Sequence, residues 1–78
     1  MPLYFFDTHD GDTLVEDEIG VECADLEAVK VQAATALTEL ARDVLPGALK
    51  RELAVEVRDA SAPVLVARMA FEAVVLAT

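Results

Sequence analysis

The sequence predicts an α+β domain in which one amphipathic helix packs on a mostly antiparallel sheet of three to four strands, in the order β-β-α-β-β. Two observations favour this fold class. One long segment has apolar residues that recur at steps of three and four, and short strand-like segments stand on both sides of it, rich in aromatic residues before it and alternating in polarity after it. Such strands and helices bury their apolar faces most simply as two layers. The chain has 78 residues and no long linker, so we expect a single domain over residues 1–78.

The first two strands are predicted to form a hairpin. Residues Leu3–Thr8 are rich in aromatic side chains, which favour strands. The pair Asp10-Gly11 follows, and it suits a type I′ turn because Asp and Gly tolerate the positive φ that this turn needs at both central positions. We expect a short return strand over Thr13–Glu16, a second turn over residues 17–20 and an extended segment over Val21–Cys23.

A helix is predicted from Leu26 to Leu45. Asp25 stands at the N-cap position, where its carboxylate can accept a backbone N–H, and Pro46-Gly47 ends the pattern. The apolar stripe that we expect to face the sheet comprises Leu26, Val29, Ala33, Leu37, Leu40 and Val44. A second group widens this stripe on one flank, more than a single sheet contact requires, and comprises Val31, Ala34, Ala41 and Leu45.

The second hairpin follows the helix. Leu53–Arg58 alternates apolar and polar residues as a half-buried strand does, Asp59–Pro63 supplies turn residues, and Val64–Phe71 alternates again. We expect these two strands to pair. The apolar tail Glu72–Thr78 is compatible with a prolonged strand and with a short helix, and its pattern does not separate the two.

Charge and composition exclude several classes of protein. Fifteen Asp and Glu residues against six Lys and Arg give a net charge of -9, which repels phosphate backbones and anionic membrane surfaces. We therefore predict no binding to nucleic acid and no membrane association. No apolar run approaches the ~20 residues of a spanning helix, and no basic segment precedes the first apolar stretch as in a signal peptide. With Cys23 as the single cysteine no internal disulfide forms, and we expect a cytoplasmic protein.

Two features indicate interactions with other proteins. Apolar residues make up 55% of a chain whose surface outweighs its interior, so we expect part of that apolar surface to lie against a second copy in a homodimer. The acidic run Glu16, Asp17 and Glu18 is most simply a solvated turn, and its functional interpretation is a binding surface for a basic protein partner.

The end of the first hairpin gathers residue types that bind metals. Asp7, His9, Asp10 and Asp12 offer carboxylate oxygens and an imidazole, which suit Mn²⁺, Fe²⁺ or Zn²⁺. Only Asp7 and His9 share a strand face, because Asp10 and Asp12 flank the turn. A polar hairpin end explains these residues more simply, so we predict no metal and no cofactor, and regard these four as the residues that a metal would use.

Catalytic constellations are absent from the sequence. Cys23 and His9 are a nucleophile and a base in type, but one cysteine and one histidine occur together in many chains, and a buried structural thiol is the simpler interpretation. The three glycines are scattered and form no phosphate-binding loop. We therefore predict no enzyme activity. The predicted function is a small interaction or regulatory module that self-associates, and the alternative is a metal- or small-molecule-binding domain that uses the end of the first hairpin.

Several short motifs resemble those of a family of small bacterial proteins of unknown function. They are Pro2, Tyr4–Phe6, Asp10-Gly11, Asp17 with Gly20, and Asp25–Ala28. The resemblance covers nearly the whole chain, since the later segment from Glu56 to Phe71 is similar to the closing hairpin of that family. It implies the fold and a bacterial cytoplasmic origin. Many relatives have His in place of Asp7, so a site built on that histidine does not carry over.

Overall fold

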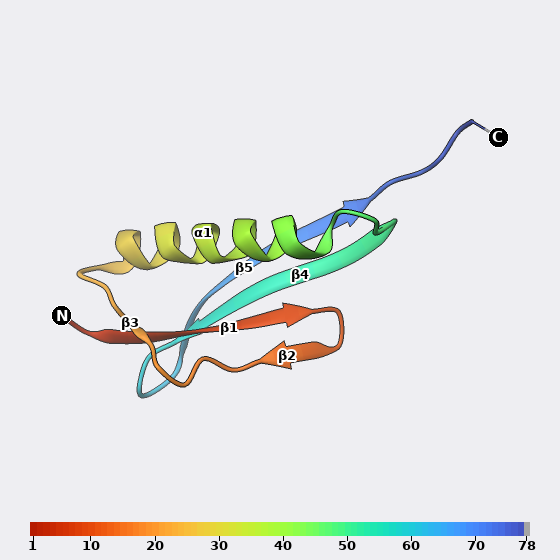
Figure 1. Cartoon of the computed structure of the whole chain (residues 1–78). Coiled ribbons are helices and arrows are strands. Elements are labelled where there is room, and N and C mark those ends of the chain that lie inside the picture. Colours follow the sequence, from red (N-terminus) through yellow and green to blue (C-terminus); the bar gives the residue numbers. More distant parts are fainter. Residues whose placement is uncertain (78) are drawn as a thin grey trace.

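The computed structural model describes residues 1–77 and contains five strands and one helix (Figure 1). The elements in chain order are β1 (Leu3–Asp10), β2 (Thr13–Val15), β3 (Val21–Glu22), α1 (Leu26–Val44), β4 (Lys50–Arg58) and β5 (Pro63–Glu72). The order of the predicted elements is confirmed. The structure adds β3, because the extended segment predicted before the helix pairs with the start of β1.

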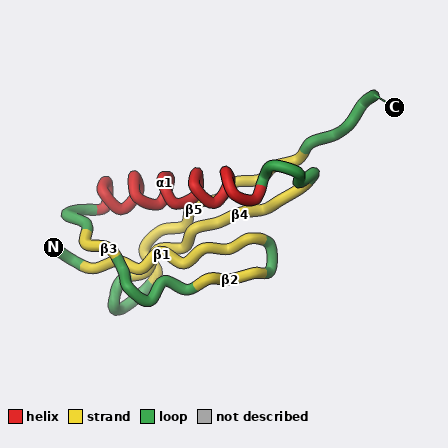
Figure 2. The backbone as a smooth tube through the Cα atoms, in the orientation of Figure 1, coloured by secondary structure: helices red, strands yellow, loops and turns green. Residues whose placement is uncertain are grey.

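The sheet is antiparallel throughout. Its strands lie in the order β2-β1-β4-β5, and β3 pairs with β1 on the side of β2. The helix α1 lies along one face of this sheet, so that the molecule has two layers (Figures 1 and 2). The predicted α+β class, with one helix on an antiparallel sheet, is confirmed.

The two ends of α1 follow the sequence signals. The Asp25 carboxylate accepts a hydrogen bond from the Ala28 backbone N–H at 2.8 Å, as an N-cap residue does. The helix is capped at Leu45, and Gly47 follows with φ of 86°, a conformation that glycine adopts without steric penalty. Local chemistry therefore decides where the helix begins and ends.

The core lies between α1 and the sheet. Val29, Val55 and Val57 are fully buried. The other buried apolar residues are Phe6, Cys23, Ala33, Leu37, Ala41 and Leu53. The predicted place of Leu26 in the helix stripe was wrong, because its side chain is 58% exposed. The buried row follows steps of four residues from Val29 to Ala41, and Leu26 lies at the helix start beside that row.

The first turn differs from its prediction. Asp10 pairs with Thr13, so the loop consists of Gly11 and Asp12. Gly11 has φ of 59°, and no non-glycine residue has a positive φ among the residues described. A type I′ turn needs positive φ at both central positions, so that prediction was wrong. Glycine at the first central position is typical of a type II′ turn, the other common two-residue hairpin connection.

Strand β5 is half-buried on one face only. Its odd-numbered residues from Leu65 to Phe71 face α1 and are partly covered, whereas its even-numbered residues from Val64 to Glu72 are exposed. Ala73 extends the pairing by one hydrogen bond to the carbonyl of Leu49, at 2.8 Å. Residues 73–77 have no regular secondary structure and run away from the domain (Figure 1). The prediction left strand and helix open for this tail, and Thr78 lies outside the described residues.

Candidate functional site

The sheet face opposite α1, here called the open face, is covered by no other element in residues 1–77 (Figure 1). Residues directly opposite each other in an antiparallel pair share a face. The pairs on this face are Phe5 with Arg58, Asp7 with Glu56, His9 with Ala54, and Ala54 with Arg68. The face therefore collects most of the charged and titratable side chains that the strands carry.

A hydrogen-bonded network closes one end of the open face. The Arg58 Nε–H donates to Asp7 Oδ2 at 2.9 Å, and Arg58 Nη2 donates to the Asp17 carbonyl at 3.1 Å. The Asp17 backbone N–H donates to Asp7 Oδ1 at 2.9 Å. The Arg58 guanidinium also lies 4.6 Å from the centroid of the Phe5 ring, a cation–π distance. Asp7 is only 7% exposed, so these donors replace the water that its carboxylate loses.

Asp17 organises the loop that leads to β3. Its Oδ2 accepts from the Phe6 backbone N–H at 3.1 Å, and its Oδ1 accepts from the backbone N–H groups of Ile19 and Gly20, both at 3.0 Å. Gly20 has φ of 83°, and a Cβ there would lie 3.0 Å from the Leu3 side chain. The loop thus needs both the carboxylate and the glycine.

The same contacts shift the pKa values of the two carboxyl groups. Burial would raise the pKa of Asp7, but the hydrogen bonds from Arg58 and from the Asp17 backbone, with the Arg58 charge, lower it below its ordinary value. Burial would also raise the pKa of Asp17, and three backbone N–H donors lower it. Both groups are therefore ionised at neutral pH, and their charges are bound to structural partners.

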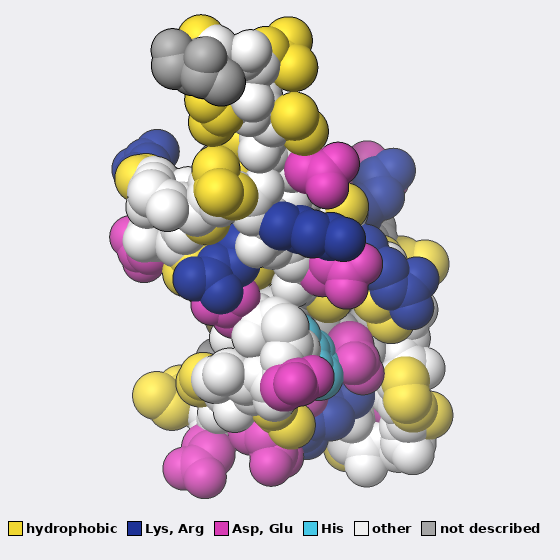
Figure 3. All heavy atoms as spheres, turned by 90° about the vertical axis from the view of Figure 1, so that its right-hand side faces the viewer, with side chains coloured by type: hydrophobic (Ala, Val, Ile, Leu, Met, Phe, Trp, Pro, Cys, Tyr) yellow, Lys and Arg dark blue, Asp and Glu magenta, His cyan; other side chains and the backbone are white. Residues whose placement is uncertain are grey.

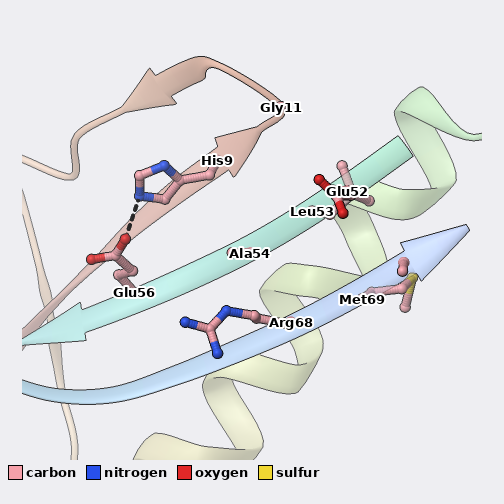
Figure 4. A pocket seen from close by; sticks show the side chains of 9 residues that line it. His9, Gly11, Glu52, Leu53, Ala54, Glu56, Arg68 and Met69 are labelled. Carbon is pink, nitrogen blue, oxygen red and sulfur yellow. Dashed lines mark ion pairs between the residues drawn. The ribbon is translucent and has the colours of Figure 1, made fainter. Parts of the chain in front are cut away.

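His9 pairs with Glu56 near the middle of the open face. His9 Nε2 lies 2.8 Å from Glu56 Oε1, and Figure 4 shows the two side chains pointing toward each other from neighbouring strands. Both residues line a shallow hollow of about 380 Å³ that Gly11, Glu52 and Arg68 also border. The hollow offers an imidazole, carboxylates and a guanidinium to anything that enters it.

The four residues that a metal would use do not converge. Asp7 is bound by Arg58 and His9 by Glu56. Asp10 lies opposite Leu53 on the helix-facing side, with Arg51 Nη1 at 3.9 Å from its Oδ1, and Asp12 is exposed in the turn. Across residues 1–77 no group of three His, Cys, Asp or Glu residues has metal-binding geometry.

The acidic run separates into two kinds of residue. Glu16 and Glu18 are exposed, whereas the Asp17 carboxylate is occupied by backbone donors. A partner would therefore meet Glu16 and Glu18, while Asp17 holds the loop that presents them. Cys23 is buried in the core as a free thiol.

Two partners were missed by the sequence analysis. Arg58 stands 51 residues from Asp7 along the chain, and Glu56 stands 47 residues from His9. The signal was present in part, because Glu56 and Arg58 alternate with apolar residues in the predicted strand and so had to share one face. Only the strand register brings them opposite the charged residues of β1.

The free edge of the sheet belongs to β5, which exposes apolar side chains together with the charged Arg68 and Glu72. Its exposed large apolar side chains and those of the tail form what we call the apolar strip: Val64, Val66, Val74, Val75 and Leu76. Exposure in the tail is high, from 69% at Val74 to 91% at Leu76. In Figure 3 the hydrophobic side chains of the tail stand at the top of the view, with charged side chains gathered below them.

The fold and the site define a small two-layer α+β domain with a polar open face and a free edge at β5. The chain belongs to a family described as a domain of unknown function, DUF6894, which matches residues 3–70. The resemblance to a small family of unknown function is thereby confirmed at the level of the family. Comparisons with curated proteins and with solved structures found no match. Within residues 1–77, no helix has the length and apolar character needed to cross a membrane.

Proposed function

We propose that this protein is an interaction module that associates with a second copy of itself. The observation that carries the proposal is the apolar strip along β5 and the tail. Large exposed apolar side chains mark interaction sites on small domains. In this strip Val64 and Val66 are separated from the apolar residues of the tail by the exposed Arg68 and Glu72. The strip follows the β5 edge of the sheet and the tail beyond it, while α1 covers one face, and β2, β3 and the Asp17 carboxylate cover the opposite edge.

The apolar strip can contribute free energy to the association of two copies. Full burial of one Val or Leu side chain contributes about 1.5–3 kcal/mol, and association costs about 4–15 kcal/mol in lost freedom of motion. Two copies bring two strips, each with five large apolar side chains that are between 36% and 91% exposed. Contact between the two strips would therefore offset part of this cost.

Sedimentation velocity at micromolar concentration tests the proposal. We expect the wild-type protein to sediment as a dimer and the Leu76→Lys variant to shift toward the monomer, because a lysine in the strip would have to lose its hydration. Ile19→Lys is the matched control, since Ile19 is 85% exposed but lies in the loop before β3, outside the strip. A wild-type protein that remains a monomer throughout the concentration range would overturn the proposal.

The second part of the proposal is a basic protein partner that binds at Glu16 and Glu18. The two exposed carboxylates flank Asp17, whose bonds hold their loop against β1. Binding of a lysine- and arginine-rich peptide should weaken in the Glu16→Gln, Glu18→Gln double variant and with added salt, because screening reduces attraction between exposed charges. Equal binding by the control variant Glu39→Gln, Asp43→Gln and by the wild type is expected. Equal loss in both double variants would show that net charge alone attracts the peptide.

The alternative function is ligand binding at the end of the first hairpin. The hollow beside His9 offers charged groups of both signs, from Glu52, Glu56 and Arg68, to a small polar ligand. A metal ion would have to compete with Glu56, which already pairs with the imidazole. Titration with acetate and with phosphate, followed by the ring resonances of His9, tests this function. Shifts that saturate and that vanish in Arg68→Gln would favour it over the interaction module, and the absence of shifts would exclude it for these anions. Calorimetric titration with Zn²⁺ and Mn²⁺ provides the corresponding test for metals.

A further inference from the structure

Strand β5 presents an unpaired row of backbone groups at the free edge. It is the last strand in the sheet order and pairs with β4 alone in the described chain. The Ala73 N–H donates to the Leu49 carbonyl, and hydrogen-bonded and non-hydrogen-bonded pairs alternate along an antiparallel ladder. The odd-numbered residues of β5 therefore bond to β4, and the even-numbered residues direct their N–H and C=O groups to the free edge. A strand added to this edge must bond to the even-numbered residues.

The sequence around Ala70 reads nearly the same in both directions. From Val64 to Leu76 it is Val-Leu-Val-Ala-Arg-Met-Ala-Phe-Glu-Ala-Val-Val-Leu, with Ala70 at its centre. Residues at equal distances on either side of Ala70 match in kind: Met69 and Phe71, Ala67 and Ala73, Val66 and Val74, Leu65 and Val75, Val64 and Leu76. The exception is Arg68 and Glu72, which carry opposite charges. Such a segment is complementary to an antiparallel copy of itself.

We propose that two copies of the chain pair β5 to β5, antiparallel, with Ala70 opposite Ala70 of the second copy. The inference rests on the proposed self-association and names the surface and the register that produce it. The two sheets become one continuous sheet across a two-fold axis at Ala70. The symmetry is isologous, so every contact away from the axis is made twice.

Charge selects this register over its neighbours. With Ala70 on the axis, Arg68 of each copy lies opposite Glu72 of the other, and opposite charges at directly paired positions stabilise a sheet. A shift of the axis to Arg68 or to Glu72 would place like charges opposite each other. An axis at Met69 or Phe71 would place Arg68 opposite an apolar residue, Ala70 or Val74. Arg68 and Glu72 are both exposed and form no ion pair with another residue in the range 1–77.

The pairing also covers the tail. Val74 and Leu76 lie on the same strand face as Val66 and Val64 if the extended course of β5 continues, and they come opposite those two residues of the second copy. The tail runs past the end of the sheet (Figure 1), where a second β5 alongside would pair with it. Near the axis an open apolar hollow, bordered by Leu45, Pro46 and Phe71, lies on the helix side. Met69 of the second copy would lie opposite Phe71, beside that hollow.

Charge reversal provides the test. Arg68→Glu places two pairs of glutamates across the axis and Glu72→Arg two pairs of arginines, so each single variant should dimerise about tenfold more weakly than the wild type. An equimolar mixture of the two variants restores both attractive pairs and should form a heterodimer. The double reversal R68E, E72R should dimerise like the wild type. Lys30→Glu and Glu39→Arg make the same charge changes on the exposed side of α1 and serve as controls.

Native mass spectrometry distinguishes the species, because the two single variants differ in mass, and circular dichroism verifies that each variant is folded. A heterodimer in the mixture and recovery in the double reversal would support the β5 pairing. If the wild type is a dimer but the single variants dimerise equally well, the β5 register is overturned while self-association stands. If the wild type is a monomer at every concentration, self-association and this inference fail together.

Discussion

The two edges of the sheet differ in whether other parts of the chain cover them. On the β1 side, the chain itself covers the edge with two short strands, and the Asp17 carboxylate accepts the Phe6 N–H where a strand would otherwise pair. On the β5 side, a strand of ten residues is left with exposed valines and an apolar tail. An unpaired edge strand can form hydrogen bonds with a strand of another chain. Proteins usually block such edges unless they use them to bind another strand. The chain itself therefore covers one edge, whereas the backbone groups of the other edge have no strand partner within residues 1–77.

The two edges also differ in the kind of interaction they use. The β1 edge depends on directional hydrogen bonds to buried or half-buried carboxylates, which lose most if a single partner is removed. The β5 edge offers exposed apolar side chains and a row of unpaired backbone N–H and C=O groups. Because these groups have no partner in the monomer, a single substitution there should change monomer stability little. Substitutions at the two edges should therefore affect different measurements, stability for one and association for the other.

The largest effect on the free energy of unfolding is expected in β4, the strand that pairs with both β1 and β5. Leu53 in β4 is 2% exposed and lies between β1 and β5. Leu53→Ala should lower the free energy of unfolding by about 2–5 kcal/mol, because a cavity remains in the core. Ile19→Ala, at an exposed loop position, should change it by less than about 0.5 kcal/mol. Urea unfolding at one fixed protein concentration measures both, and equal effects would contradict the placement of the core.

The second-largest effect on stability is expected at the β1 edge, where Asp17 binds the backbone. Asp17→Ala leaves the N–H groups of Phe6, Ile19 and Gly20 without their acceptor, so the free energy of unfolding should fall by about 1–3 kcal/mol. Glu18→Ala, next to it but exposed, should change stability by less than about 0.5 kcal/mol. Amide hydrogen exchange should show faster exchange at Phe6 in Asp17→Ala alone. Unchanged protection there would refute this role of Asp17.

Acid should weaken the same edge by a smaller amount. The pKa values of Asp7 and Asp17 are lower in the folded protein than in the unfolded chain, so the unfolded state binds more protons as the pH falls. Their contribution to stability is complete above about pH 5, well above the unfolded pKa, and is lost as the pH falls through the folded pKa values. Protonation leaves an oxygen that still accepts hydrogen bonds, so the loss is smaller than in Asp17→Ala. Unfolding measured from neutral to acidic pH should be less steep in Asp17→Asn.

The smallest effect on monomer stability is expected at the free edge. Val66 is exposed on β5, so Val66→Lys should change the unfolding free energy of the monomer by less than about 0.5 kcal/mol. The same substitution should shift sedimentation toward the monomer, because Val66 would face Val74 of a second copy. Thr35→Lys on the exposed side of α1 is the control and should leave both quantities unchanged. A large loss of monomer stability would contradict the exposed placement of Val66.

Local signals predicted much of the fold. The N-cap at Asp25, the end of the helix at Pro46-Gly47 and the alternation of β4 and β5 depend on a few neighbouring residues, and the structure confirms each of them. The predicted turn type at Gly11 was wrong. Both type I′ and type II′ turns accept glycine, and the strand register decides which residues occupy the central positions. The predicted burial of Leu26 was wrong, because the spacing of apolar residues does not show how far along the helix the sheet extends.

The contacts of the candidate site were harder to predict from the sequence than the fold was. Asp7, His9 and Asp17 stood out as polar residues near the first hairpin, but Arg58 and Glu56 pair with them from a strand about fifty residues later. The sequence by itself determined the elements, their order and the side chains of each face, because periodicity, caps and turns act within a few residues. Only the tertiary structure decided which charges meet, which edge is covered and which is free, because strand register joins residues that are far apart in the chain.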